Sequence, residues 1–273
     1  MTTITLHNPK TAARTTTGLV SSTATITRRA ALRYVRTPQL ILMATLQMSL
    51  FFLIYRYMFG GAIHAGSIPY VDYLVPGFVA TGVLFSGLGA SVAMAEDLEH
   101  GFVDRLRSLP IPRSSVLAAR AIADTAILAL ASAVTVGIAF AVGFRLHGSV
   151  LQGLAAFGLV VVFGFAFEWM FVAIGLLAGN AQAAQGMGMI VFPLTFISSA
   201  YVPVASMPGW LQVFAKAQPL TWMVDAVRAL TLGSRAQVEL GHPASYYVAR
   251  AAAWAAAVFA ATAPLAVARY RRG

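Results

Sequence analysis

Cysteine is absent from this chain of 273 residues. Its absence excludes disulfide bonds, thiolate metal ligands and a cysteine nucleophile. Charged residues are also scarce, at 10% of the chain, and only nine residues are acidic. The five histidines are scattered through the sequence without the spacing that metal ligands need. The sequence therefore predicts no catalytic residue, no metal site and no cofactor bound by this chain.

A nucleotide-binding motif is missing as well. The chain has no GxxxxGK[ST] loop, so it lacks that route to ATP binding and hydrolysis. Hydrophobic residues, in contrast, make up 59% of the chain, and the mean hydropathy is +0.75, which is typical of an integral membrane protein. A membrane span needs about 20 mainly apolar residues. Six runs qualify: Gln39–Met58, Tyr73–Ala95, Val116–Gly143, Leu151–Ala178, Gly186–Val204 and Tyr246–Ala268.

The Lys and Arg residues are predicted to lie mostly on one side of the membrane. With the N-terminus in the cytoplasm, 13 of the 19 Lys and Arg residues fall on the cytoplasmic face. The positive-inside rule therefore places both termini in the cytoplasm of a multi-pass protein of the inner (plasma) membrane. The net charge of +10 is then explained by topology and by attraction to anionic membrane lipids, and we expect no nucleic-acid partner.

The N-terminal region divides into two parts. Residues 1–25 are Thr-rich without a hydrophobic period and are predicted to form a disordered cytoplasmic tail, and residues 26–273 form the transmembrane domain. The stretch Ile26–Arg36 has apolar residues on one helical face and four arginines on the other, which predicts an amphipathic helix in the inner interface. The alternative is a basic flank that only orients the first span.

The fifth apolar run is interrupted by prolines between Val191 and Trp210, and an amphipathic stretch, Leu211–Leu232, follows it. Non-helical backbone at membrane depth is tolerated only where protein or a cavity surrounds it. We therefore expect the chain to reach the outer face near Tyr201 and to form one or two short re-entrant helices before the sixth span. The alternative is a simple interfacial aromatic belt, made of Trp210, Trp222, Tyr246 and Tyr247.

The charged segment EDLEHGFVDRLRSLPIPR, Glu96–Arg113, separates two long apolar runs. On a helical wheel, four apolar residues share one face: Leu98, Phe102, Leu106 and Leu109. Most of the polar residues lie on the opposite face, and Arg105 is the exception. Gly101 is expected to end the preceding span or to bend the chain there, and the prolines at 110 and 112 stop the helix. Arg105 within the apolar face favours a protein groove with an acidic wall, and the alternative is an interfacial helix that anchors to lipid.

Here the sequence resembles the permease subunits of ABC-2 type transporters, particularly the daunorubicin-resistance-like drug exporter branch. The first match is a pair of acidic residues, a glycine, a leucine, a proline and a basic residue in this order: Glu96, Glu99, Gly101, Leu106, Pro110 and Arg113. The second match is Val202–Leu230, which resembles the outer proline-flanked re-entrant helices of the family and ends with Asp225 and Arg228. Six spans and the chain length agree as well.

The resemblance implies a transport protein that is not itself an enzyme. The segment after the second span would be a coupling helix in a cleft of a separate ATP-binding subunit, which would hold the ATP and Mg. The coupling residues that it implies are Glu96, Glu99, Gly101, Phe102, Arg105, Leu106 and Leu109. A second copy or a sister permease would complete the complex, and membrane lipids would surround it. The cargo would be a hydrophobic drug, antibiotic or lipid.

Other functions stay open at this point. An exporter of glycan or lipid-linked polymer would share the architecture. A proton-coupled carrier would use Glu168, and a membrane scaffold would transport nothing.

Charged residues within the apolar runs are candidates for the substrate pathway. Glu168 lies among five aromatic residues in the fourth run, where an ionised carboxylate is costly unless it is paired or protonated. One interpretation is that Glu168 contacts a cationic amphiphile or is a proton-linked site. The alternative is a structural role, in which a protonated or paired carboxylate bridges two helices. Arg56 can reach the headgroups, and the resemblance would also let it line an outer gate. Asp124 with Arg120, and Asp225 with Arg228, have the spacing of helix-surface pairs.

Overall fold

The computed structural model describes residues 23–25, 27–28, 38–63, 68–103 and 112–272, and its regular elements are helices. The predicted all-α class is thus confirmed. In chain order the elements are α2 (Pro38–Met58), α3 (Tyr70–Glu99), α5 (Arg113–Ala141), α6 (Val150–Ala178), α7 (Ala181–Met189), α8 (Pro193–Phe196), the 3₁₀ turn η1 (Val204–Ser206), α9 (Gly209–Ala217), α10 (Pro219–Leu232), α11 (Ser234–Leu240) and α12 (Ala244–Arg272). The amphipathic N-terminal helix predicted from residue 26 falls mostly outside the described residues.

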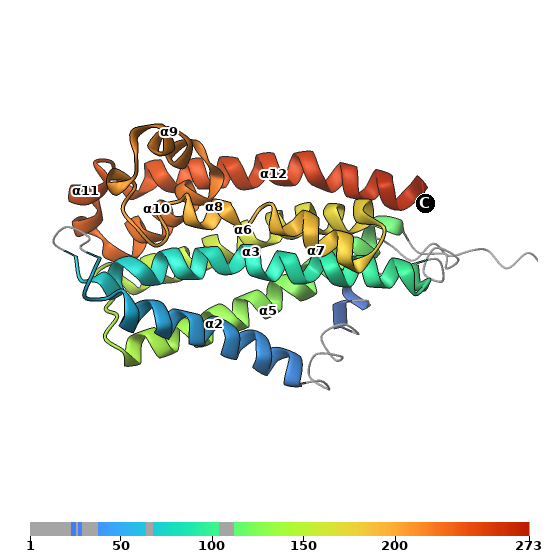
Figure 1. Ribbon diagram of the computed structural model, residues 1–273, viewed down its shortest axis with the longest axis horizontal. Coiled ribbons are helices and arrows are strands. Elements are labelled where there is room, and N and C mark those ends of the chain that lie inside the picture. Colours follow the sequence, from blue (N-terminus) through green and yellow to red (C-terminus); the bar gives the residue numbers. More distant parts are fainter. Residues whose placement is uncertain (1–22, 26, 29–37, 64–67, 104–111, 273) are drawn as a thin grey trace, which may run out of the picture.

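The long helices form an elongated bundle (Figure 1). Helices α3, α6 and α12 run side by side, α2 and α5 lie along one flank, and α9 to α11 gather at one end. We name that end the Tyr70 end, because α3 begins there, and the opposite one the Glu99 end, because α3 ends there. The C-terminus lies at the Glu99 end.

Four helices in the described part of the chain are long and apolar enough to cross a membrane: Tyr70–Glu99, Ser114–Ala141, Val150–Ala178 and Ala244–Arg271. They correspond to the second, third, fourth and sixth predicted runs. Helix α2 coincides with the first run. The fifth run is not one helix, since α7 ends at Met189 and α8 is a separate turn of four residues.

The fourth and fifth predicted runs leave residues 179–185 between them, but the chain turns within the first two of these residues and α7 begins at Ala181. Gly179 ends α6 with φ of +78°, a conformation that glycine adopts without steric cost. Asn180 then caps α7, its side-chain oxygen accepting a hydrogen bond from the Ala183 N–H at 2.7 Å. The alanines and glutamines that follow are good helix formers, which explains the short turn.

Close packing of α3 against α6 depends on small residues. A Cβ atom on Gly175 of α6 would overlap the Ser91 carbonyl oxygen on α3, and one on Gly87 of α3 would overlap the Phe171 ring on α6. The two backbones can approach this closely only because these positions carry no side chain.

We predict that Gly175→Ala destabilises the protein by about 1–3 kcal/mol, because the new methyl group overpacks the contact with Ser91. Thermal unfolding of the purified protein in detergent checks this. Gly158→Ala on the same helix is the matched control, since its Cβ would meet no atom within 4 Å. Equal melting temperatures for the two variants would contradict the predicted overlap.

Candidate functional site: a cavity and the segment beside it

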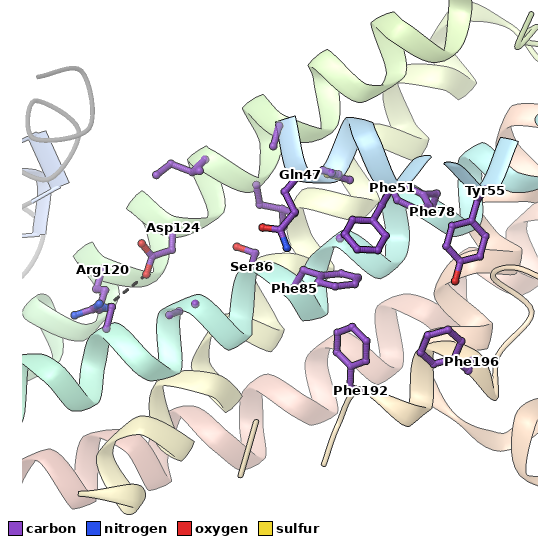
Figure 2. A pocket seen from close by; sticks show the side chains of 18 of the residues that line it. Gln47, Phe51, Tyr55, Phe78, Phe85, Ser86, Arg120, Asp124, Phe192 and Phe196 are labelled. Carbon is purple, nitrogen blue, oxygen red and sulfur yellow. Dashed lines mark ion pairs between the residues drawn. The ribbon is translucent and has the colours of Figure 1, made fainter. Parts of the chain in front are cut away.

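A cavity of about 680 Å³ lies between α2, α3, α5 and α8. Its walls change in character along its length, with charged residues at one end and aromatic residues at the other (Figure 2). The two kinds of lining residue that matter most are the charged set, Glu96, Asp97, Arg120 and Asp124, and the aromatic set, Phe51, Tyr55, Phe78, Phe85, Phe192, Phe196 and Tyr201. Volume and lining are those of a small-molecule site.

The aromatic end is held by ring contacts between distant segments. Tyr55 of α2 stacks on Tyr201 with ring centroids 4.7 Å apart, and Phe85 of α3 meets Phe192 edge to face at the same distance. The Tyr201 hydroxyl is 3.0 Å from the Thr81 hydroxyl, so its polar atom is satisfied inside an apolar wall. The broken fifth run therefore completes this end of the cavity.

The charged end centres on Arg120 of α5. Its Nε lies 3.6 Å from Asp124 Oδ2, so the predicted pair is present, and its Nη1 donates to Asp97 Oδ2 on α3. The link to Asp97 was not predicted, because Asp97 and Arg120 are 23 residues apart and no local spacing relates them. Two helices that line the cavity are thus joined by one guanidinium.

Glu168 on α6 lies next to the cavity, behind Ser86. Its side chain is only 1% exposed, and its Oε1 accepts a hydrogen bond from Ser86 Oγ at 2.8 Å. Its Oε2 has no hydrogen-bond partner among the described residues. Ser86 itself lines the cavity, so Glu168 is one hydrogen bond away from its interior. Both earlier interpretations of Glu168, a bridge between helices and a contact for cargo, agree with this position.

The predicted coupling segment begins as part of α3. Glu96 and Glu99 lie in its last turn. Gly101, with φ of +65°, follows the end of the helix, so of the two predicted roles, ending the span or bending the chain, it ends the span. Phe102 follows with 42% of its surface exposed, while Val103 is buried in a cluster with Leu117, Trp169 and Tyr270. The remaining predicted coupling residues, Arg105, Leu106 and Leu109, lie outside the described residues.

A second group of functional predictions falls at the Tyr70 end. Arg228 donates to Asp225 Oδ1 at 3.1 Å, so the predicted pair is present. The expectation that it lies on a helix surface is wrong, since the Arg228 side chain is 2% exposed. Its guanidinium also donates to the backbone oxygens of Ser199 at 2.8 Å and Tyr73 at 3.2 Å.

These contacts tie α10 to α3 and to the loop before η1. Arg228 and Asp225 also line a separate cavity of about 540 Å³. Arg56 lines neither of these two cavities.

Comparison with known proteins gives a consistent result. The family model described as ABC-2 type transporter matches residues 21–232. The chain is 32% identical over 223 residues to the daunorubicin resistance ABC transporter permease protein DrrB1 of Streptomyces coeruleorubidus, covering 81% of this chain and 79% of that protein. It is 24% identical over 215 residues to the probable doxorubicin resistance ABC transporter permease protein DrrC of Mycobacterium tuberculosis, covering 78% of each.

Proposed function

Because this chain belongs to the ABC-2 type transporter family, we propose that it is the membrane-spanning permease of an exporter that moves a hydrophobic drug, antibiotic or lipid out of the cell. A separate subunit binds and hydrolyses ATP with Mg. The observation that supports this proposal most is the cavity between α2, α3 and α5, which ends beside the segment that follows α3.

The cavity suits an amphiphile of drug size. Its aromatic walls offer flat apolar surface to a ring system, and the carboxylates at its other end favour an amine. Since the cargo's charged group would otherwise be dehydrated in the membrane, three carboxylates at one end lower the cost of transfer. A cavity bounded by so many rings favours a compact amphiphile over a long polar polymer.

The second part of the proposal concerns the partner. Phe102 is exposed next to buried Val103, so the chain after Gly101 is anchored to the bundle while it presents an aromatic side chain outward. We assign Glu96, Glu99, Gly101 and Phe102 to the docking of the ATP-binding subunit, together with Arg105, Leu106 and Leu109 from the sequence. Closure of two ATP-binding subunits would then bias the bundle between two packings.

The proposed topology follows from this assignment. Helix α2 and the broken α7–α8 segment supply the two spans beyond the four long helices, and α9 and α10 are the outer re-entrant element that contains Asp225 and Arg228. The Glu99 end then faces the cytoplasm of a plasma-membrane protein, with both termini on that side. Two permeases, identical or sister chains, form the complete pathway in the lipid bilayer.

The proposed function is tested by reconstitution. The permease and its ATP-binding subunit are inserted in liposomes, and daunorubicin accumulation is followed by its fluorescence with ATP, with a nonhydrolysable analogue, and with a proton gradient alone. We expect accumulation with ATP only. Accumulation driven by the proton gradient without the ATP-binding subunit would overturn the proposal in favour of a proton-coupled carrier.

For Glu168→Gln we predict a loss of daunorubicin transport of about tenfold with little change in stability. The amide oxygen can still accept from Ser86, so the helix contact is preserved while the carboxylate charge is removed. Initial transport rates in proteoliposomes and the melting temperature check this. Ser86→Ala is the control that removes the hydrogen bond and keeps the carboxylate. Unchanged transport with a lowered melting temperature in Glu168→Gln would leave only the structural role.

A further inference from the structure

One guanidinium joins two helices at the charged end of the cavity. Arg120 Nη1 donates to Asp97 Oδ2 on α3, while its Nε faces Asp124 on its own helix at 3.6 Å. Figure 2 shows Arg120 and Asp124 together at this end, away from the aromatic rings. Among the described residues that line the cavity, Arg120 is the only cation beside three carboxylates. No other lining side chain in that set can pair with Asp97 by charge.

The bridge also touches the segment that we assign to docking of the ATP-binding subunit. In the described residues this segment is Glu96–Phe102, and we name it the docking segment. Asp97 is in the last turn of α3, four residues before Gly101 and five before the exposed Phe102. Leu98, the next residue, packs on the buried cluster that contains Val103 and Leu117 of α5. Because Leu98 of α3 and Val103 pack in the same cluster, a movement of the chain around Phe102 is passed across Gly101 to the last turn of α3, which carries Asp97.

We propose that Arg120 is a positioning residue that latches α3 to α5 across the inner end of the cavity, so that the docking segment and the cavity move together. This inference rests on the proposed function, which assigns the cargo to the cavity and the ATP-binding subunit to the docking segment. With the Arg120–Asp97 bridge formed, α3 and α5 are held together at this end. When the bridge breaks, the two helices can separate and the inner mouth of the cavity opens.

The environment of the bridge suits a contact that must form and break. The side chains of Arg120 and Asp97 are 20% and 31% exposed, so water reaches both when they part. A fully buried pair would be costly to separate, because each charge would be left without a partner. A fully exposed pair would hold the helices only weakly. Partial burial gives an interaction strong enough to bias two packings and weak enough to reverse.

A distance measurement tests the latch directly. Since the chain has no cysteine, His100→Cys and Ile122→Cys place unique spin labels on the exposed end of α3 and on α5. In the full-length protein in lipid nanodiscs we expect one narrow distance distribution, and a second, longer population with Arg120→Gln. The exchanged pair Asp97→Arg with Arg120→Asp should restore the narrow distribution. Arg269→Gln, an exposed arginine on α12, is the matched control.

The second readout is the amount of daunorubicin moved per ATP hydrolysed by the reconstituted complex. We expect Arg120→Gln to lower this ratio about fivefold, which corresponds to about 1 kcal/mol of lost coupling, because the inner mouth then opens whether or not ATP is hydrolysed. The exchanged pair should recover most of the ratio. A purely structural role would reduce the yield and melting temperature but leave the ratio as it is in Arg269→Gln.

The outcomes separate this inference from the proposed function. If the wild-type complex transports with ATP, and Arg120→Gln matches Arg269→Gln in both spin-label distance and coupling ratio, the latch is overturned and the exporter stands. If the wild-type complex shows no ATP-driven transport, the proposed function fails. The spin-label distances of Arg120→Gln and of the exchanged pair then decide alone whether Arg120 holds α3 to α5.

Discussion

Phe102→Ala should reduce ATP-driven transport by about thirtyfold while the permease still inserts and folds. Phe102 is 42% exposed and lies in the segment that we assign to the ATP-binding subunit. Aromatic side chains at the centre of an interface commonly contribute about 2 kcal/mol or more to binding, which corresponds to a factor of about thirty. The measurement is co-purification of the ATP-binding subunit together with daunorubicin transport in proteoliposomes.

The control for Phe102 is Phe140→Ala, because Phe140 has the same exposed fraction of 42% and lies in the last turn of α5. The chain just after that turn contacts Asp72 at the start of α3, which is the opposite end of the bundle from Phe102. Loss of a ring from a comparably exposed site should leave both co-purification and transport close to wild type. Normal subunit binding together with normal transport in Phe102→Ala would contradict the docking assignment. It would leave the cavity as a cargo site without an assigned link to the ATP-binding subunit.

Arg228→Ala should be the most destabilising single substitution considered, with a loss of about 3–5 kcal/mol, because it leaves the Asp225 carboxylate without its charged partner in the protein. The same change removes hydrogen bonds to the Ser199 and Tyr73 oxygens and the stacking of the guanidinium 3.7 Å from the Tyr73 ring centroid. We expect a large fall in the melting temperature and in the yield of folded protein.

Arg250→Ala is the matched control for Arg228. Arg250 also lies over aromatic rings, 4.6 Å from Trp222 and 4.5 Å from Tyr246, but its side chain is exposed. Its removal should therefore cost about 0.5–1 kcal/mol, the contribution of exposed cation–π contacts. Melting temperatures that fall equally in the two variants would show that burial of the Arg228 hydrogen bonds adds nothing to stability.

Part of this molecule was predictable because the relevant signals are local. The apolar runs placed α3, α5, α6 and α12 to within a few residues, since a span must be long, apolar and helical. Pairs three or four residues apart, such as Asp124 with Arg120, followed from the helical repeat alone. The motif around Gly101 and the second motif at Val202–Leu230 were enough to identify the family.

Two features of the structure differ from what the sequence indicates, at the turn before α7 and at the Asp225–Arg228 pair. The predicted apolar runs leave seven residues, 179–185, between α6 and the fifth run, yet one glycine and one capping asparagine are enough to reverse the chain. Likewise, spacing alone paired Asp225 with Arg228 but said nothing about burial. That burial arises because α10 packs against α3 and α6, which are far away in the sequence.

The sequence by itself determined the all-helical class and the long apolar helices, because composition and periodicity reflect the demands of the bilayer on each segment, and its two motifs indicated the family. Only the tertiary structure decided that Asp97 meets Arg120, that Ser86 meets Glu168, and that Tyr55 meets Tyr201 to close an aromatic wall. Each of these contacts joins segments more than 20 residues apart. Their distances depend on how whole helices pack, which no local pattern encodes.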